Sequence, residues 1–87
     1  MATQTSGHVA NGVATARRSY LRFVTLTAPA ANDLTCIMTD GLAGVEHWRA
    51  TAKANTSQHF VFPDNILFHV GIYVTGDNYG RVVVGWI

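Results

Sequence analysis

With 87 residues, 48 % of them hydrophobic, the chain is long enough for one folded domain and too apolar for intrinsic disorder. Six lysines and arginines against five acidic residues give a net charge of +1, which excludes a strong field directed at nucleic acid or at a membrane surface. The single cysteine, Cys36, excludes an internal disulfide, and the paired cysteines of a structural zinc site are missing.

Residues 1–16 differ from the rest, because they contain no Asp, Glu, Lys or Arg and no aromatic residue. Such a composition cannot bury enough apolar surface to fold by itself. We therefore expect an extended N-terminal arm, which is either a disordered terminus or a strand laid along another protein. On this expectation every strand of the β-sandwich domain, residues 17–87, begins at Arg17 or later, and the domain folds without the arm.

Targeting and membrane-spanning segments are not expected. A secretory signal needs a basic start, and the first basic side chain is Arg17. The most apolar run, residues 66–74, is much shorter than the roughly 20 residues of a membrane helix.

Alternating apolar and polar residues predict β-strands over most of the remaining chain. Strand-favouring Val, Ile, Thr and aromatic residues are abundant, and good helix formers are scarce. Turn-forming residues separate the apolar runs, Pro63-Asp64-Asn65 among them. The pattern predicts six or seven strands, at residues 18–28, 34–40, 45–53, 58–63, 66–70, 72–75 and 81–87. The predicted fold class is all-β: a small antiparallel β-sandwich or a jelly-roll-like barrel.

Two of these runs need separate interpretation. In residues 18–28 the apolar parity changes near Phe23 and Val24, which indicates a β-bulge or a bend. Residues 45–54 contain several good helix formers, so a helix is the alternative there. The same residues also alternate, with Trp48 on the apolar side, and we favour a strand.

A shared parity through the later runs predicts the core. Its expected members are Phe60, Phe62, Phe68, Ile72, Val74, Val82, Val84 and Trp86. Val70 has the same parity and is placed on the same side. Truncation of a buried Phe62 to Ala would cost about 3–5 kcal/mol. Cys36 shares a face with Leu34 and Met38, which predicts a buried, unreactive thiol.

No motif in the sequence indicates catalysis, a metal or a cofactor. The four histidines, His8, His47, His59 and His69, have no spacing that would chelate a metal on a strand or a helix. The carboxylates mostly flank turns, where capping explains them. Nucleophile elbows and phosphate-binding loops are missing as well. We therefore expect a protein that is not an enzyme.

Exposed basic and aromatic residues mark a candidate interface. Arg17, Arg18 and Arg22 cluster at the start of the first long strand, with Tyr20 between them, and Tyr73 and Tyr79 are further candidates. Arg and Tyr are enriched at the centres of protein interfaces. Basic and aromatic residues together also suit nucleic acid. With a net charge of +1 we favour a protein partner and expect neither nucleic acid nor a membrane.

The apolar residues suggest self-association. Residues 66–75 and 81–87 carry apolar side chains on both parities, although a sheet of a sandwich has one solvated side. Exposed apolar patches usually mark interfaces, so we expect a homo-oligomer or a component of a larger assembly. The alternative is a central strand that is buried on both sides.

The C-terminal half resembles a family. The ordered series Ala54-Asn55-Thr56-Ser57, Phe60-Val61-Phe62-Pro63, Gly71-Ile72-Tyr73-Val74 and Gly80-Arg81-Val82-Val83-Val84-Gly85-Trp86 is similar to small all-β virion proteins of tailed bacteriophages, some of which are capsid cement or decoration proteins. The resemblance implies a non-enzymatic virion protein, made in the host cytoplasm, that binds the major capsid protein or another virion protein. It also implies a symmetric homo-oligomer, with a trimer favoured.

Two other functions stay open. A module of the phage tail or fibre would contact a host glycan through Tyr20, Tyr73, Tyr79 or Trp48. A small enzyme is the third and weakest hypothesis.

Overall fold

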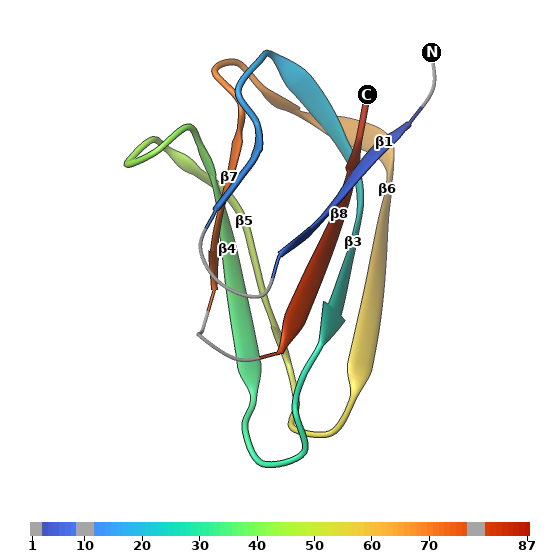
Figure 1. Ribbon diagram of the computed structural model, residues 1–87. Helices are drawn as coiled ribbons and strands as arrows, with labels where there is room; N and C mark the ends of the chain where they lie inside the picture. Colours follow the sequence, from blue (N-terminus) through green and yellow to red (C-terminus); the bar gives the residue numbers. More distant parts are fainter. Residues whose placement is uncertain (1–2, 9–11, 77–79) are drawn as a thin grey trace.

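The fold is described by a computed structural model for residues 3–8, 12–76 and 80–87. These residues form an all-β structure of two four-stranded antiparallel sheets, a small β-sandwich, rather than the six or seven strands predicted. Sheet A has the order β1-β8-β3-β6 and sheet B the order β2-β7-β4-β5 (Figure 1). The strands are β1 (Gln4–His8), β2 (Gly12–Thr15), β3 (Ser19–Thr27), β4 (Leu34–Asp40), β5 (Glu46–Ala52), β6 (Ser57–Phe68), β7 (Ile72–Gly76) and β8 (Arg81–Trp86). Within the described ranges there is no helix that could cross a membrane.

The strand pairing follows one rule along the chain. β4 pairs with β5, β3 with β6, β2 with β7 and β1 with β8, all antiparallel. The chain is thus a double-stranded ribbon with its tip at the turn of residues 41–45 and its open end at the two termini. The ribbon crosses between the sheets, and the additional pairs β3–β8 and β4–β7 complete sheet A and sheet B.

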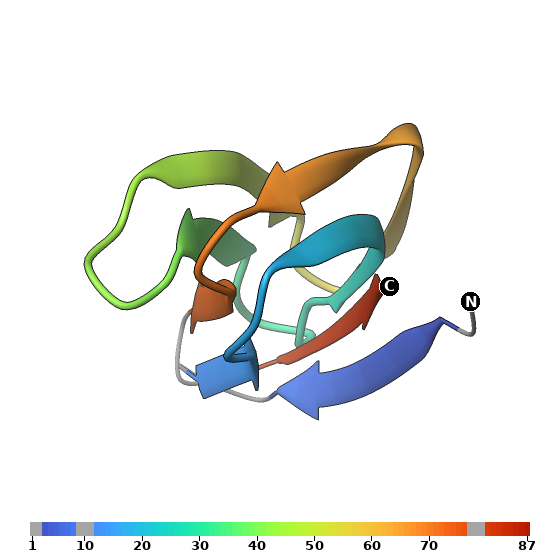
Figure 2. The same ribbon diagram turned by 90° about the horizontal axis from the view of Figure 1, so that it is seen from above.

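The prediction that every strand begins at Arg17 or later is wrong. β1 and β2 lie within the segment expected to be an arm, and β1 runs beside β8 in both views (Figure 1, Figure 2). Gln4 pairs with Trp86, and Gly12 pairs with Val74. The small side chains of this segment hide the signal, because main-chain hydrogen bonds to an open sheet edge need no large apolar residue.

The bulge predicted in the first long run is confirmed. The register of β3 shifts between Leu21 and Phe23 against both of its neighbours, so that Arg22 is the extra residue. The prediction of separate strands at 58–63 and 66–70 is wrong, because β6 runs without a break from Ser57 to Phe68. Residues 62–65 bulge opposite Arg22, and Asn65 has a positive φ of 54°. The turn residues therefore shape a wide bulge on an edge strand, where Pro is tolerated.

The core lies between the two sheets. Five of the predicted core residues, Phe68, Ile72, Val74, Val82 and Val84, are buried, which confirms them. Phe60, Phe62 and Trp86 are only half-buried and pack against the core from its border. The prediction was too strong for these three; Phe60 and Phe62 stand on the edge strand β6. Other buried members are Leu21, Val24, Leu26, Leu34, Cys36, Met38 and Ala52.

The ambiguous segment 45–54 forms the strand β5, as favoured. Trp48 of β5 contacts Phe60 and Phe62 of β6, with ring centroids 5.1 and 5.7 Å apart and edge-to-face geometry. These rings join the edge strands of the two sheets, so they close one side of the sandwich. Val70 departs from the predicted core side and is 64 % exposed, because the chain bends at residues 69–71 between β6 and β7.

Candidate functional site

A groove opens beside the tip of the ribbon. Its lining residues are Val13, Thr15, Ala16, Gly41, Leu42, Val70, Ile72 and Tyr73, and they surround a cavity of about 150 Å³. Three of them are unusually exposed for aliphatic side chains: Leu42 at 75 %, Val70 at 64 % and Val13 at 55 %. Val45, at 69 %, is also exposed and lies in the same turn as Leu42, residues 41–45. A cluster of this kind on an 87-residue chain is typical of a contact surface.

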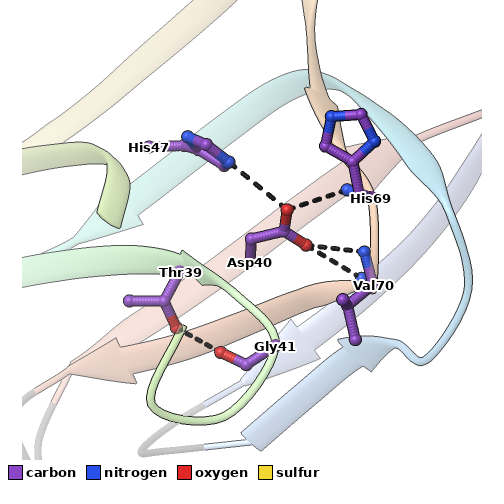
Figure 3. A network of polar contacts seen from close by, with 7 residues as sticks. Thr39, Asp40, Gly41, His47, His69 and Val70 are labelled. Carbon is purple, nitrogen blue, oxygen red and sulfur yellow. Dashed lines mark hydrogen bonds and ion pairs between the residues drawn. The ribbon is translucent and has the colours of Figure 1, made fainter. Parts of the chain in front are cut away.

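One carboxylate anchors the backbone of the groove residue Val70. Asp40 ends β4, and its Oδ1 accepts hydrogen bonds from the N–H groups of Val70 at 2.6 Å and Gly71 at 3.3 Å. Its Oδ2 accepts one from the N–H of His69 at 3.0 Å (Figure 3). Asp40 thereby ties the corner between β6 and β7, where the chain passes from sheet A to sheet B, to the end of β4.

Further contacts support this anchoring. The Nε2 of His47 lies 3.5 Å from Asp40 Oδ2, and the His47 ring packs edge-on against the buried Phe68 at 5.0 Å. The N–H of Gly41 donates to the carbonyl of Gly71 at 3.0 Å. Gly41 has a φ of 81°, and a Cβ there would lie 3.1 Å from Val70, so glycine suits both the turn and the groove wall.

The environment of Asp40 favours its charged form. Burial of the carboxyl works against ionisation, but the three backbone N–H donors and His47 outweigh it and lower its pKa from 3.8 to about 2. The unfolded chain therefore binds this proton at a higher pH than the folded chain does. The stability that the carboxylate contributes is complete above pH 4–5 and is lost as the pH falls through 3.8 towards 2.

Replacement of Asp40 should measure this contribution. Asp40→Ala leaves three N–H groups without their acceptor and is expected to lower the free energy of unfolding by about 2–4 kcal/mol. Asp40→Asn keeps one acceptor oxygen but removes the charge, and is expected to lower the free energy of unfolding by about 1–3 kcal/mol, the range for hydrogen bonds to a charged group. Urea unfolding at several pH values provides the measurement. If the wild type and Asp40→Asn lose stability equally between pH 5 and 2, the assignment of the acid-sensitive step to Asp40 is wrong.

A second exposed surface lies on the outer side of sheet A. The register aligns Leu67, Tyr20 and Ile87 in one row across β6, β3 and the end of β8, and Tyr20 and Ile87 exchange backbone hydrogen bonds of 2.8 and 3.0 Å. The next row contains Val61, Phe23 and Gly85. The Phe23 ring covers Gly85, because a Cβ on this glycine would overlap the ring.

The arginines border these rows. Arg18 directly precedes β3, and Arg22 is the bulged residue between the row of Tyr20 and the row of Phe23. Arg17, Arg18 and Arg22 are exposed, and Tyr20 is 39 % exposed. We call this outer surface with its arginines the arginine face: Arg17, Arg18, Arg22, Tyr20, Phe23, Val61, Leu67 and Ile87.

The interface residues predicted from the sequence do not form one site. Four of them, Arg17, Arg18, Tyr20 and Arg22, belong to the arginine face. Tyr73 lies on β7 in sheet B, pairs with Val13 and lines the groove. Tyr79 lies outside the described residues. The structure therefore divides the predicted interface between two surfaces on different sheets.

The groove itself could not be found by inspecting runs of sequence. Its exposed aliphatic residues come from three distant segments, represented by Val13, Leu42 and Val70. The parity of residues 66–74 even places Val70 in the core. A usable signal was the turn Gly41-Leu42-Ala43-Gly44, because a leucine at the tip of a glycine-rich turn has no sheet face to join.

Among the described residues, neither surface has a free thiol or a metal-binding cluster. The Cys36 thiol is buried as predicted, and desolvation raises its pKa to about 12, so it stays protonated at neutral pH. His59 shares a 2.6 Å contact with the Thr25 hydroxyl on sheet A, and its ring centroid lies 5.6 Å from that of Phe23. The described part of the chain contains no group of three His, Cys, Asp or Glu side chains that could hold a metal ion. The side chain of His8 is outside that description.

Comparison with known proteins adds no relative. No protein-family model matches the sequence, and neither a curated protein nor a solved structure matches it. Function must therefore be argued from the surfaces and the strand pairing.

Proposed function

We propose that this chain is a non-enzymatic structural protein that works through protein–protein contacts, as a decoration or cement protein on the head of a tailed bacteriophage. The observation that supports this most is the exposure of apolar side chains on two separate surfaces. Leu42 and Val70 are each more than 60 % exposed in the groove, and Val61 is 62 % exposed on the arginine face. Such surfaces gain free energy when another protein covers them.

The strand pairing supports the same function. We interpret the sandwich as an eight-stranded jelly roll, because the ribbon of paired strands is wound across two four-stranded sheets. Jelly rolls occur in viral capsid and lectin domains. This fold analogy agrees with the resemblance of residues 54–86 to phage virion proteins.

We assign self-association to the groove. The exposed groove residues Val13, Leu42 and Val70 are uncharged, so two or three copies can meet there without like-charge repulsion. The arginine face is then the surface that binds the major capsid protein or another virion protein. In this proposal the protein stabilises the shell by mass action, since every bound copy favours the assembled state.

The groove predicts the oligomeric state. The wild type is expected to be an oligomer at about 100 µM, with a trimer favoured, and Leu42→Asp or Val13→Asp is expected to produce monomers, because a carboxylate would be buried in the contact. Light scattering coupled to size-exclusion chromatography measures the mass.

A control variant separates this effect from misfolding. Ala30→Asp introduces the same charge at an exposed position in the loop between β3 and β4, at the other end of the sandwich. It should leave the oligomer intact, and circular dichroism should be the same for all variants. A wild type that stays monomeric at this concentration would contradict self-association through the groove. Attachment to a shell would then have to be tested separately.

The setting of the protein can be tested by its copy number. Quantitative mass spectrometry of purified particles should show this chain in amounts comparable to the major capsid protein. Only a few copies per particle would contradict a head decoration protein and support a tail or fibre component.

A glycan-binding module of the tail or fibre is the second candidate. Tyr73 favours it, because this half-buried ring lines the groove together with Thr15, and a ring beside a hydroxyl group can contact a sugar. The Trp48 ring already packs against Phe60 and Phe62, and Tyr20 lies on the other sheet. Tyr73 would therefore act without the other proposed aromatic residues. Glycan-array binding that Tyr73→Ala abolishes would support this candidate.

A further inference from the structure

The charges on the arginine face have no partner of their own. Arg49 is paired with Glu46, and Lys53 with Asp33, at 2.7 and 4.0 Å. In contrast, the guanidinium groups of Arg17, Arg18 and Arg22 make no ion pair with any described residue. Three planar cations with five donors each are thus available to an incoming group.

The centre of the same face is apolar. Tyr20 lies between Leu67 and Ile87, and Phe23 lies beside Val61 with its ring over Gly85. These side chains stand on paired strands of one sheet, so their arrangement is held by the backbone and needs little ordering on binding. An apolar centre with charges at its border is the usual anatomy of a protein interface.

We infer that the arginine face binds a heterologous protein surface that carries carboxylates around an apolar centre. Carboxylates match the guanidinium fork in geometry and charge, and the aliphatic side chains of a partner would cover Tyr20, Phe23 and Leu67. This inference rests on the proposed function and names the chemistry of the partner. On a phage head, the partner would be an acidic patch of the shell.

A second copy of this chain fits the face poorly. In an isologous contact the three arginines of one copy would approach those of the other, and like charges repel. Among the described side-chain carboxylates, only Asp64 makes no ion pair, and Asp77 lies outside the described residues. A second copy therefore brings too few free carboxylates to neutralise its partner.

Titration with defined peptides tests this inference on the full chain. The probe is a short labelled peptide in which Glu alternates with Leu and Tyr, and the comparison probes are the same peptide with Lys for Glu and a single-stranded oligo-dT. Amide NMR spectra of isotope-labelled protein should show shifts at Tyr20, Phe23 and Leu67 with the Glu peptide. The Kd should rise several-fold as salt is raised from about 0.05 to about 0.3 M, since exposed charge pairs are screened.

Matched variants locate the binding. The double variant Arg18→Ser, Arg22→Ser is expected to raise the Kd of the Glu peptide about tenfold, and Tyr20→Ser to raise it by a similar factor. Arg49→Ser is the control, because Arg49 lies on sheet B and is already paired with Glu46. This variant should leave the Kd of the Glu peptide unchanged.

Three results would overturn the inference. They are equal binding of the Lys peptide, tighter binding of oligo-dT than of the Glu peptide, and no shift on the arginine face at about 1 mM Glu peptide, a concentration that detects even weak contacts. None of these three results would bear on self-association through the groove. If the chain self-associates but does not bind the Glu peptide, the acidic partner is rejected and the proposed function stands. If the chain is monomeric and scarce in particles, the proposed function itself is rejected.

Discussion

Removal of residues 1–16 is expected to destabilise the protein severely. The truncated chain loses five residues of β1 and four of β2, and with them the backbone pairing to β8 and β7. Each hydrogen bond contributes a net stabilisation of about 0.5–1.5 kcal/mol, and the free energy of unfolding of the whole domain is only about 4–13 kcal/mol. We expect a fall in Tm of about 20 °C or more, or no cooperative transition at all. Thermal unfolding followed by circular dichroism measures it.

Two substitutions distinguish pairing from the mere presence of the segment. Ala14 on β2 is half-buried and packs against the core, so Ala14→Asp should also lower Tm clearly. Thr5 on β1 is exposed, and Thr5→Asp should change Tm by only a few degrees. A truncated protein that melts like the wild type would show that β1 and β2 contribute nothing to the fold, as the sequence first suggested.

Truncation of Phe68 is expected to be the most damaging single substitution. Phe68 is fully buried at the end of β6, where it contacts the His47 ring beside the Asp40 carboxylate. Phe68→Ala should cost about 3–5 kcal/mol through lost burial and the cavity left behind. Urea unfolding gives this free energy directly.

Phe62 provides the matched comparison. It is half-buried and touches Trp48 at the border of the core, so Phe62→Ala should cost about 1–2 kcal/mol, less than expected from its parity alone. Equal losses for the two variants would mean that the β5–β6 side is as tightly packed as the centre of the sandwich.

Alternation predicts a strand well when one face of that strand is buried. Residues 34–40 and 81–87 behave in this way, because Leu34, Cys36 and Met38, like Val82 and Val84, enter one core. Alternation does not identify β1 and β2. They are edge strands held by main-chain hydrogen bonds, and a run of Thr, Ser and Gly gives no parity to recognise.

The errors at β6 and Val70 have a different origin. Pro63-Asp64-Asn65 has the composition of a turn, but a partner strand on one side keeps the chain extended and turns these residues into a bulge opposite Arg22. Val70 follows the parity of the strand before it, and Asp40, which is 30 residues away in sequence, holds the bend that redirects it. Long-range hydrogen bonds of this kind leave no mark within a local window.

The two candidate surfaces also differ in how well the sequence predicts them. The arginine face can be anticipated, because Arg17, Arg18, Tyr20 and Arg22 are close in the sequence and lie on β3 or directly before it. The groove cannot, because three segments create it only after both sheets have formed. Sequence patterns therefore find sites built on one element more easily than sites built between elements.

The position of β8 in its sheet also sets the order of folding. The ribbon tip at residues 41–45 needs the shortest loop, whereas the pairing of β1 with β8 closes nearly the whole chain, and the entropic cost of closure rises with loop length. β8 occupies the place between β1 and β3, so sheet A stays divided until residues 81–86 have joined it. We therefore expect β8 to be added late in folding, and a chain cut before residue 81 to expose two open strand edges that invite aggregation.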